Sequence, residues 1–160
     1  MPALIQALRD PDQKVCEGAA EALGDVGPEA GQAVPALLEV LNPGDGSLCV
    51  KAAVALRKID PQAEGVIPVL IDVLKDQGNS ARGMAAYTLK ELGPEAQEAV
   101  PALIDTLNDR NDGMRAIAAR TLGAIGPRAQ EAVPALRAML QDRRLTNRVL
   151  AAQALWQIAD

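Results

Sequence analysis

Prolines recur along this chain at a constant interval of 33 residues. The series stands at Pro2, Pro35, Pro68, Pro101 and Pro134, and no insertion or deletion interrupts it. A constant period of this length is typical of repeat proteins, in which each unit buries its apolar face only by packing on its neighbours. Proline fits the first turn of a helix, because its missing N–H would have no partner there. Each member of the series therefore predicts the start of a helix.

A second series of prolines has the same period and predicts where a longer helix ends. Its members are Pro28, Pro61, Pro94 and Pro127. Glycine precedes three of these four prolines, and a Gly-Pro pair terminates helices because glycine accepts the left-handed cap conformation. In the second repeat Asp60 replaces this glycine, so we expect a less regular helix end there. The Ala-rich segment that follows Pro94 predicts a helical turn leading into the next first helix.

Apolar residues between the prolines follow helical spacing. In the fourth repeat, Leu103 and Leu107 lie four residues apart in the first helix, and the second helix has an inward stripe at i, i+4, i+8 and i+11. This stripe consists of Met114, Ala118, Leu122 and Ile125 in the fourth repeat and of Val15, Ala19, Leu23 and Val26 in the first. Alanines beside the stripe predict where neighbouring second helices approach closely. They are Ala20, Ala53, Ala86, Ala119 and Ala152.

Composition supports an all-α fold. One Trp, one Tyr and no Phe leave Leu, Ile, Val and Ala to build the core, and Leu and Ala are strong helix formers. Alternating runs of β-branched residues, which are typical of strands, are missing. The sequence therefore predicts a single domain over residues 1–160, built from five two-helix repeats with the boundaries 1–34, 35–67, 68–100, 101–133 and 134–160.

The repeats open with Pro-Ala-Leu, continue through a turn aspartate and contain the pattern Val/Met-Arg-x-x-Ala-Ala-x-x-Leu-Gly-x-Ile-Gly-Pro, which residues 101–133 match almost throughout. This pattern resembles HEAT repeats, specifically the short bacterial HEAT-like type that is also found in phycobilisome lyase subunits. The resemblance implies a right-handed α-solenoid, an armadillo-type superhelix whose second helices line the concave side.

The same resemblance implies a polar ladder between a turn aspartate and a second-helix arginine that links successive repeats. In this sequence the ladder maps onto Asp76 with Arg82, Asp109 with Arg115, and Asp142 with Arg148. Cys16 and Cys49 stand where the first two repeats would have arginine, and Pro43 replaces the aspartate of the second repeat. We therefore expect a looser junction around the second repeat.

One stripe of the second helices changes in every repeat, whereas the core columns hardly change. At one of its positions the residue is Val54, Tyr87, Arg120 or Gln153 in successive repeats. Packing does not dictate such positions, and exposed apolar groups with Tyr or Arg are typical of interaction surfaces. We predict that a partner binds to Val50, Lys51, Val54, Met84, Tyr87, Lys90, Ile117, Arg120 and Gln153. The alternative is that this stripe is an ordinary solvated or self-packed surface.

Charge argues against nucleic acid as a partner. The net charge is −5; residues 1–80 carry 6 basic and 12 acidic groups, and residues 81–160 carry 10 basic and 9 acidic groups. Binding to phosphates depends on many lysines and arginines on one surface, and neither half has such a patch.

Catalytic chemistry has little to build on in this sequence. The chain has no histidine, which excludes a Ser-His-Asp triad, a Cys-His pair and the usual His-based metal sites. Cys16 and Cys49 come without further metal ligands, and carboxylate pairs such as Glu17 with Glu21 are expected to be solvated. We therefore expect no enzymatic activity, no cofactor and no metal.

The surroundings of the chain are also predicted. No apolar run is long enough to span a bilayer, no signal-peptide pattern precedes the repeats, and two cysteines make no disulfide framework, which favours a cytoplasmic protein without a membrane partner. Terminal repeats usually need polar caps, and the first repeat has none. Either the chain is a fragment of a longer array, or it forms a homodimer through an uncapped end or an apolar concave face.

These patterns together predict a non-catalytic scaffold for protein–protein interaction, which binds a protein or peptide on the concave second-helix face. The alternative that the resemblance implies is an accessory subunit of an enzyme such as a bilin lyase.

Overall fold

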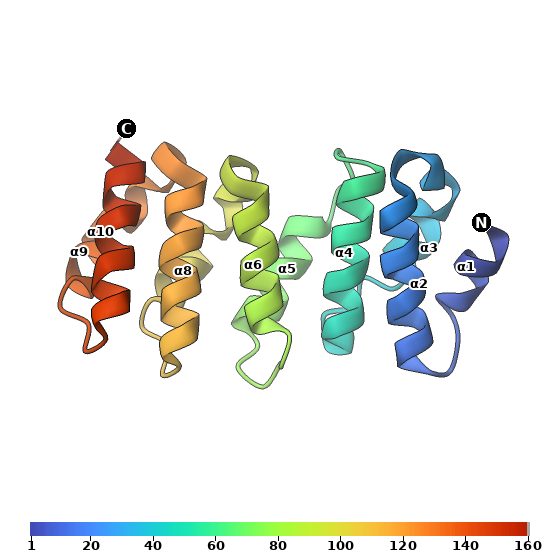
Figure 1. The fold of residues 1–160 in the computed structure, drawn as a ribbon, viewed down its shortest axis with the longest axis horizontal. Helices are drawn as coiled ribbons and strands as arrows, with labels where there is room; N and C mark the ends of the chain where they lie inside the picture. The colour runs from blue at the N-terminus through green and yellow to red at the C-terminus, as the bar shows by residue number, and fades with distance from the viewer. Residues whose placement is uncertain (160) are drawn as a thin grey trace. The chain divides into compact units, whose positions relative to one another are not determined.

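The computed structural model describes residues 1–159, and all regular secondary structure in this range is helical (Figure 1). Each repeat contributes a first and a second helix, so the prediction of an all-α solenoid of two-helix repeats is confirmed. The first helices are α1 (Pro2–Ala7), α3 (Val34–Glu39), α5 (Val66–Lys75), α7 (Val100–Thr106) and α9 (Val133–Met139). The second helices are α2 (Gln13–Val26), α4 (Ser47–Ile59), α6 (Arg82–Leu92), α8 (Asp112–Ile125) and α10 (Leu145–Ala159). Short 3-10 segments are η1 (Gly27–Ala33), η2 (Pro43–Asp45), η3 (Gly93–Ala99) and η4 (Gly126–Ala132).

The chain packs into two compact units, unit 1 (Met1–Met84) and unit 2 (Ala85–Asp160). In unit 1, α2 and α4 lie side by side, and α1 and α3 pack against them (Figure 1). In unit 2, α8 and α10 lie side by side in the same way, with α7 and α9 against them. Within the described residues, no helix has the length and apolar character needed to cross a bilayer.

Local interactions explain where the helices begin. Proline lies in the first turn of the first helices, as the period predicts; Pro101 is the second residue of α7. Side chains cap α2 and α8: Oδ1 of Asp12 accepts from the N–H of Lys14 at 2.9 Å, and Oδ1 of Asn111 accepts from the N–H of Gly113 at 2.8 Å. Each cap provides an acceptor for an N–H that has no partner within the helix.

Glycines end the second helices with a positive φ, as the Gly-Pro pairs predict. Gly27 and Gly126 have φ of 70° and 69°, but their ψ of −145° and −142° differs from the left-handed helical cap that was expected. The segment after Pro94 forms the 3-10 helix η3, which confirms the helical turn expected there, and η1 and η4 follow Gly27 and Gly126 in the same way. After α4 the connection differs: Asp60 is extended, its Oδ1 accepts from the N–H of Gln62 at 3.0 Å, and Gly65 with φ of 84° precedes α5.

Leucines at equivalent positions fill the core of both units. Leu23, Leu56, Leu89 and Leu122 have no exposed surface. The prediction was wrong for two inward residues of the first repeat, Val15 and Val26, which are 41% and 40% exposed. Their equivalents in the second repeat, Leu48 and Ile59, are buried.

Neighbouring second helices approach closely beside the predicted alanines. Ala20, Ala53, Ala86 and Ala119 have no exposed surface, whereas Ala152 of α10 is exposed. The tightest approach involves glycine: a Cβ on Gly24 would lie 3.0 Å from Cα of Ala55, and a Cβ on Gly123 would lie 3.1 Å from Cα of Ala154. Glycine therefore sets the spacing of α2 with α4 and of α8 with α10.

Candidate functional site

The residues predicted to bind a partner divide between the two units, and one of them is not accessible. Val50 has no exposed surface, so its placement on an exposed stripe was wrong. It lies in the first turn of α4, next to the loop that precedes α6: Nδ2 of Asn79 donates to the carbonyl of Pro43 at 3.0 Å, and the Asn79 side chain lies against Gly46. A second helix in a solenoid is covered on three sides, by its own first helix and by both neighbouring repeats, so its exposed stripe is narrow.

Unit 1 has a shallow groove of about 160 Å³ along α2 and α4. Three of the predicted residues line it, together with charged side chains that the prediction omitted, Glu21 and Lys58. Lys51 and Val54 are half-buried and Met84 is 41% exposed. The groove thus offers apolar side chains between charged edges, on the predicted face of the second helices.

Ion pairs between α2 and α4 connect the charged side chains along this groove. Nζ of Lys51 lies 3.4 Å from Oε2 of Glu17 and 3.3 Å from Oε2 of Glu21, and Nζ of Lys58 lies 2.9 Å from Oδ1 of Asp25. Burial alone lowers the pKa of Lys51, but the hydrogen bonds and charges of Glu21 and Glu17 together outweigh burial, and the pKa is raised. The lysine is therefore charged at neutral pH, and the acidic groups outnumber the basic ones along this edge.

In unit 2 two of the predicted residues, Tyr87 and Lys90, pair with each other, and Arg120 is near them. Tyr87 is 54% exposed, and Nζ of Lys90 lies 4.9 Å from the centre of its ring, within the range of a cation–π interaction. Lys90 also donates to Oε1 of Glu91 at 2.7 Å, and this hydrogen bond is the main reason why its pKa is raised; the nearby charge of Arg120 lowers it. Arg120 and Gln153 are exposed and Ile117 is half-buried.

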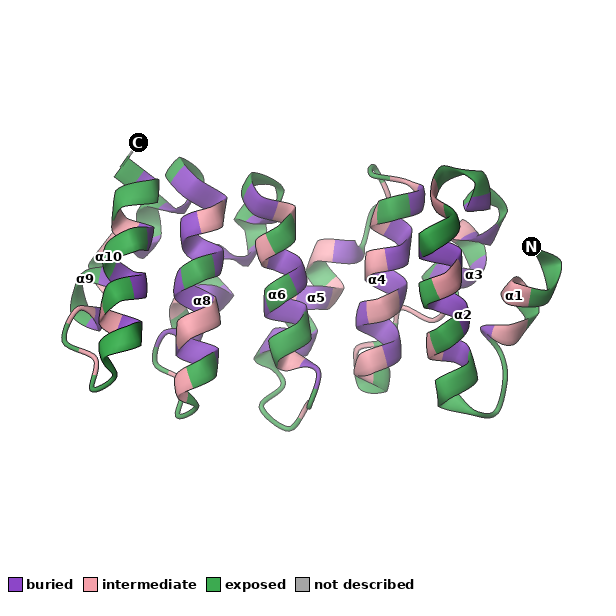
Figure 2. Ribbon diagram, in the orientation of Figure 1, coloured by how far each residue is buried: buried purple, intermediate pink, exposed green. Residues whose placement is uncertain are grey.

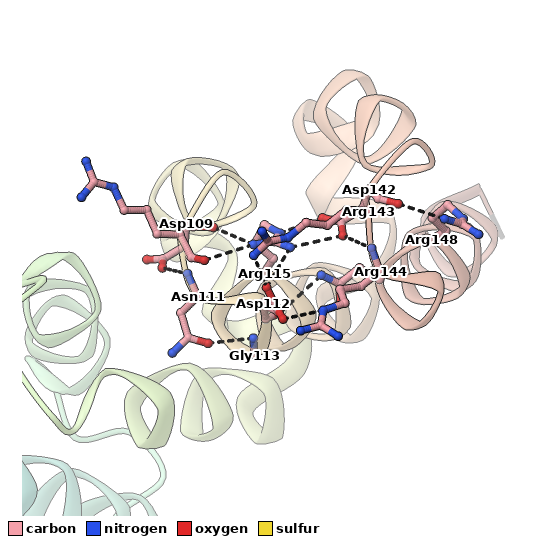
Figure 3. A network of polar contacts seen from close by, with 11 residues as sticks. Asp109, Asn111, Asp112, Gly113, Arg115, Asp142, Arg143, Arg144 and Arg148 are labelled. Carbon is pink, nitrogen blue, oxygen red and sulfur yellow. Dashed lines mark hydrogen bonds and ion pairs between the residues drawn. The ribbon is translucent and has the colours of Figure 1, made fainter.

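The polar ladder exists in unit 2, with partners one repeat further along than the predicted pair (Figure 3). The predicted partners Arg115 and Asp109 are in contact through the backbone, because NH1 of Arg115 donates to the Asp109 carbonyl at 2.9 Å. In addition, Nε of Arg115 donates to Oδ2 of Asp142 in the next repeat at 2.7 Å, a partner that was not predicted. This arginine lowers the pKa of Asp142 to about 2. The ladder therefore joins the turn before α8 to the turn before α10.

Sequence reasoning missed a second part of this network. Asp112 accepts from Arg143 at 2.6 Å and from Nε of Arg144 at 2.7 Å (Figure 3), and the Arg143 hydrogen bond is the main cause of its lowered pKa. The only signal in the sequence is a pair of opposite charges about one period apart, because the positions equivalent to Asp112 in other repeats are not acidic.

The two cysteines are buried and free, and each occupies the position that the ladder arginine has in other repeats. Sγ of Cys16 donates to the carbonyl of Asp10 at 3.0 Å, the contact that Arg115 makes with Asp109. Burial, assisted by nearby carboxylates, raises the pKa of the Cys49 thiol to about 11, so it is protonated at neutral pH. Among residues 1–159, no three His, Cys, Asp or Glu side chains are grouped so that they could hold a metal ion.

A family model described as HEAT repeats matches residues 1–90 and residues 67–156 of the chain. The two matches together cover nearly all of it. None of the curated proteins compared with the chain matches it.

Several solved structures with a similar fold are engineered or designed proteins. A designed armadillo repeat protein in complex with the peptide (KR)4 has a TM-score of 0.73 and 18% identity, over 97% of this chain and 80% of that one. An engineered protein has a TM-score of 0.70 and 23% identity, over 98% and 78%. Computationally designed armadillo repeat proteins for modular peptide recognition have a TM-score of 0.69 and 18% identity, over 96% and 80%. At these identities the likeness concerns the fold.

Proposed function

Because the chain belongs to the HEAT-repeat family, we propose that it is a non-catalytic scaffold that binds a protein or peptide on the exposed face of its second helices. One observation carries the proposal: side chains that differ between repeats are exposed beside side chains that do not differ. Tyr87 is 54% exposed, although Ala86 and Leu89 on the same helix have no exposed surface. Packing constrains the two buried residues and leaves Tyr87 available for recognition.

The side chains around Tyr87 suit a partner segment with acidic and apolar groups. Tyr and Arg are the residues most often found as hot spots, and here an exposed ring stands with Lys90 and Arg120 near it. Carboxylates of a partner would form charge-assisted hydrogen bonds with these cations, while an apolar side chain would pack on the ring. The designed armadillo repeat proteins of similar fold support a peptide as the partner, since one is in complex with a peptide and others are designed for peptide recognition.

The described chemistry supports binding without catalysis. The Cys49 thiol has a raised pKa of about 11, which leaves little of the thiolate that a nucleophile needs. The carboxylates of Glu17 and Glu21 pair with Lys51 at the edge of an open groove, whereas a general acid needs an enclosed site that raises its pKa. No specific observation among the described residues favours the alternative of an accessory subunit of a bilin lyase.

A displayed peptide library tests the proposal, because it needs no knowledge of the natural partner. Peptides selected on the wild-type chain are labelled, and their affinities are measured by fluorescence anisotropy. The double variant Tyr87→Ala with Arg120→Ala should bind at least about tenfold more weakly, because a hot-spot side chain typically contributes more than 1 kcal/mol. Arg137→Ala, which removes an exposed arginine of α9, is the matched control and should bind normally. Unchanged affinity of the double variant for every selected peptide would overturn the proposal.

A further inference from the structure

Among the described residues, three arginine side chains converge on one carboxylate at the turns that precede α8 and α10 (Figure 3). Oδ1 of Asp112 accepts from NH2 of Arg143 at 2.6 Å and from NH2 of Arg115 at 3.3 Å. Oδ2 of the same carboxylate accepts from Nε of Arg144 at 2.7 Å. The guanidinium groups come from two successive repeats, and the carboxylate marks a place where the chain already holds an anion between convergent donors.

The two turns carry more positive charge than their own carboxylates neutralise. Residues 109–115 and 142–148 contain five arginines and three aspartates, so their net charge is five minus three, or +2. The equivalent residues of the first three repeats are 10–16 with one lysine and two aspartates, 43–49 with one aspartate, and 76–82 with one arginine and one aspartate. A positive surplus is therefore confined to the last two repeats, in a chain whose net charge is −5.

Two of the converging arginines are accessible to a ligand. Exposed residues predominate in the turn that precedes α10 (Figure 2), and the side chains of Arg143 and Arg144 are 71% and 64% exposed, against 9% for Arg115. A guanidinium group has five N–H donors. Within residues 1–159, the side chains of Arg143 and Arg144 donate to Asp112, so most of their donors remain for a ligand.

We propose that Arg115, Arg143 and Arg144 form an anion site that binds the phosphoryl group of a phosphorylated serine or threonine in a partner peptide. Such a group carries a charge of about −1.5 to −2 at neutral pH and three acceptor oxygens, which matches the surplus charge of the two turns and the three guanidinium groups. Arginine suits this role because its planar fork donates parallel hydrogen bonds to phosphate oxygens. In the bound state the phosphoryl oxygens replace those of the Asp112 carboxylate.

The internal carboxylate makes the site selective for a doubly charged anion. Asp112 has one negative charge, so a carboxylate of a partner would replace it without any gain in charge, whereas a phosphoryl group adds nearly one further charge. A nucleic acid fits less well, because its phosphates carry single charges along a strand and binding depends on cations over an extended surface. The positive surplus of this chain is limited to two turns.

An NMR titration of the isotope-labelled chain with defined peptides tests the proposal. The probe is a peptide of glycine and asparagine with one phosphoserine, and the comparison peptides have serine or glutamate at that position. The phosphorylated probe alone should shift the Nε–H signals of Arg143 and Arg144. Its affinity should rise between pH 5 and pH 7, because the second pKa of the phosphoryl group is about 6. Asp112 stays ionised in this range, since the Arg143 hydrogen bond is the main cause that lowers its pKa.

Paired double variants show whether these two arginines hold the probe. Arg143→Gln with Arg144→Gln should weaken its binding about tenfold or more, because charge-assisted hydrogen bonds from two guanidinium groups are lost. Arg128→Gln with Arg137→Gln is the matched control, since it removes two exposed arginines from the same unit, and it should bind normally. Tyr87→Ala should bind normally as well, so a failure of this site is distinguishable from a failure of the surface around Tyr87.

Asp112→Asn separates an anion site from a link that only joins two repeats. The variant should bind the phosphorylated probe more tightly than the wild type, because the internal carboxylate no longer occupies the site in a fraction of the chains. Circular dichroism checks that each variant is folded.

Four results would each overturn the proposal. They are shifts by the phosphorylated probe that are no larger than those by the serine peptide, equal affinities of the two double variants, an Asp112→Asn affinity no higher than that of the wild type, and an oligothymidylate that binds more tightly than the probe.

Discussion

The α2–α4 junction in unit 1 and the α8–α10 junction in unit 2 have the same backbone approach and different polar contacts. Glycine meets alanine in both: a Cβ added to Gly24 would lie 3.0 Å from Cα of Ala55, and a Cβ added to Gly123 would lie 3.1 Å from Cα of Ala154 and nearer still to the end of the Gln157 side chain. In unit 2, the side chains of the Arg115–Asp142 pair are only 9% and 8% exposed. The repeat geometry is therefore set by small residues and does not depend on one polar arrangement.

Unit 1 relies on exposed charges instead. Nitrogen NH2 of Arg9 lies 2.6 Å from Oε2 of Glu39, but these side chains are 65% and 59% exposed, and Cys16 takes the position of the ladder arginine. Exposed ion pairs contribute little to stability, whereas removing one member of a buried pair leaves a charge without a partner. The Arg115–Asp142 pair and the Arg9–Glu39 pair should therefore respond very differently to the loss of one charge.

Arg115→Ala should have the largest effect on this comparison. It leaves the buried carboxylate of Asp142 without its arginine, and we expect the free energy of unfolding to fall by about 3 kcal/mol. The matched variant Arg9→Ala in unit 1 should leave the free energy of unfolding almost unchanged, because this pair is exposed to solvent. Urea unfolding followed by circular dichroism gives both values, and amide exchange should show the loss of protection in α8 and α10. Equal destabilisation by the two variants would contradict the distinction between the junctions.

Acid should weaken unit 2 through the same pair. The pKa of Asp142 is lowered from 3.8 to about 2 in the folded chain, chiefly by the Arg115 hydrogen bond. A carboxyl group with a lowered folded pKa stabilises the fold above its unfolded pKa, and this contribution is lost as the pH falls through the folded pKa. The free energy of unfolding should therefore lose a contribution of about 2 kcal/mol between pH 5 and pH 2. Urea midpoints of wild type and Asp142→Asn across this range measure it, and a variant as pH-sensitive as the wild type would refute the assignment.

The fold could be predicted because the same information is repeated in every unit. Prolines and leucines of equal spacing mark the helices, and a repeat whose pattern is ambiguous can be assigned by comparison with the other repeats. Val15 and Val26 were misjudged because burial in a solenoid depends on how the neighbouring elements pack, which the helical spacing within one repeat does not determine. The ladder was assigned within repeats for a related reason, since Arg115 and Asp142 belong to different repeats.

The candidate binding surface was harder to predict than the fold. Period and helical spacing identify a side that differs between repeats, but they do not tell how far adjacent helices cover it, and Val50 is fully buried for this reason. The groove in unit 1 also depends on Lys51 and Lys58, whose carboxylate partners come from the neighbouring helix. Ion pairs of this kind do not recur at equivalent positions of the repeats, so a comparison of equivalent positions does not reveal them.

Replacing the glycine that the two junctions share should have the smallest effect on the free energy of unfolding, and the effect should be equal in both junctions. In Gly24→Leu and Gly123→Leu, overpacking against Ala55 or Ala154 costs about 1 to 3 kcal/mol, and the better helix propensity of leucine returns nearly 1 kcal/mol. A net loss of between about zero and about 2 kcal/mol is therefore expected from both variants. Gly18→Leu is the matched control on α2, because no atom lies within 4 Å of its Cβ position; it should keep only the propensity gain. If Gly123→Leu were far more disruptive than Gly24→Leu, the polar network of unit 2 would have to share in setting the helix spacing, and the two junctions would differ in their backbone contact as well.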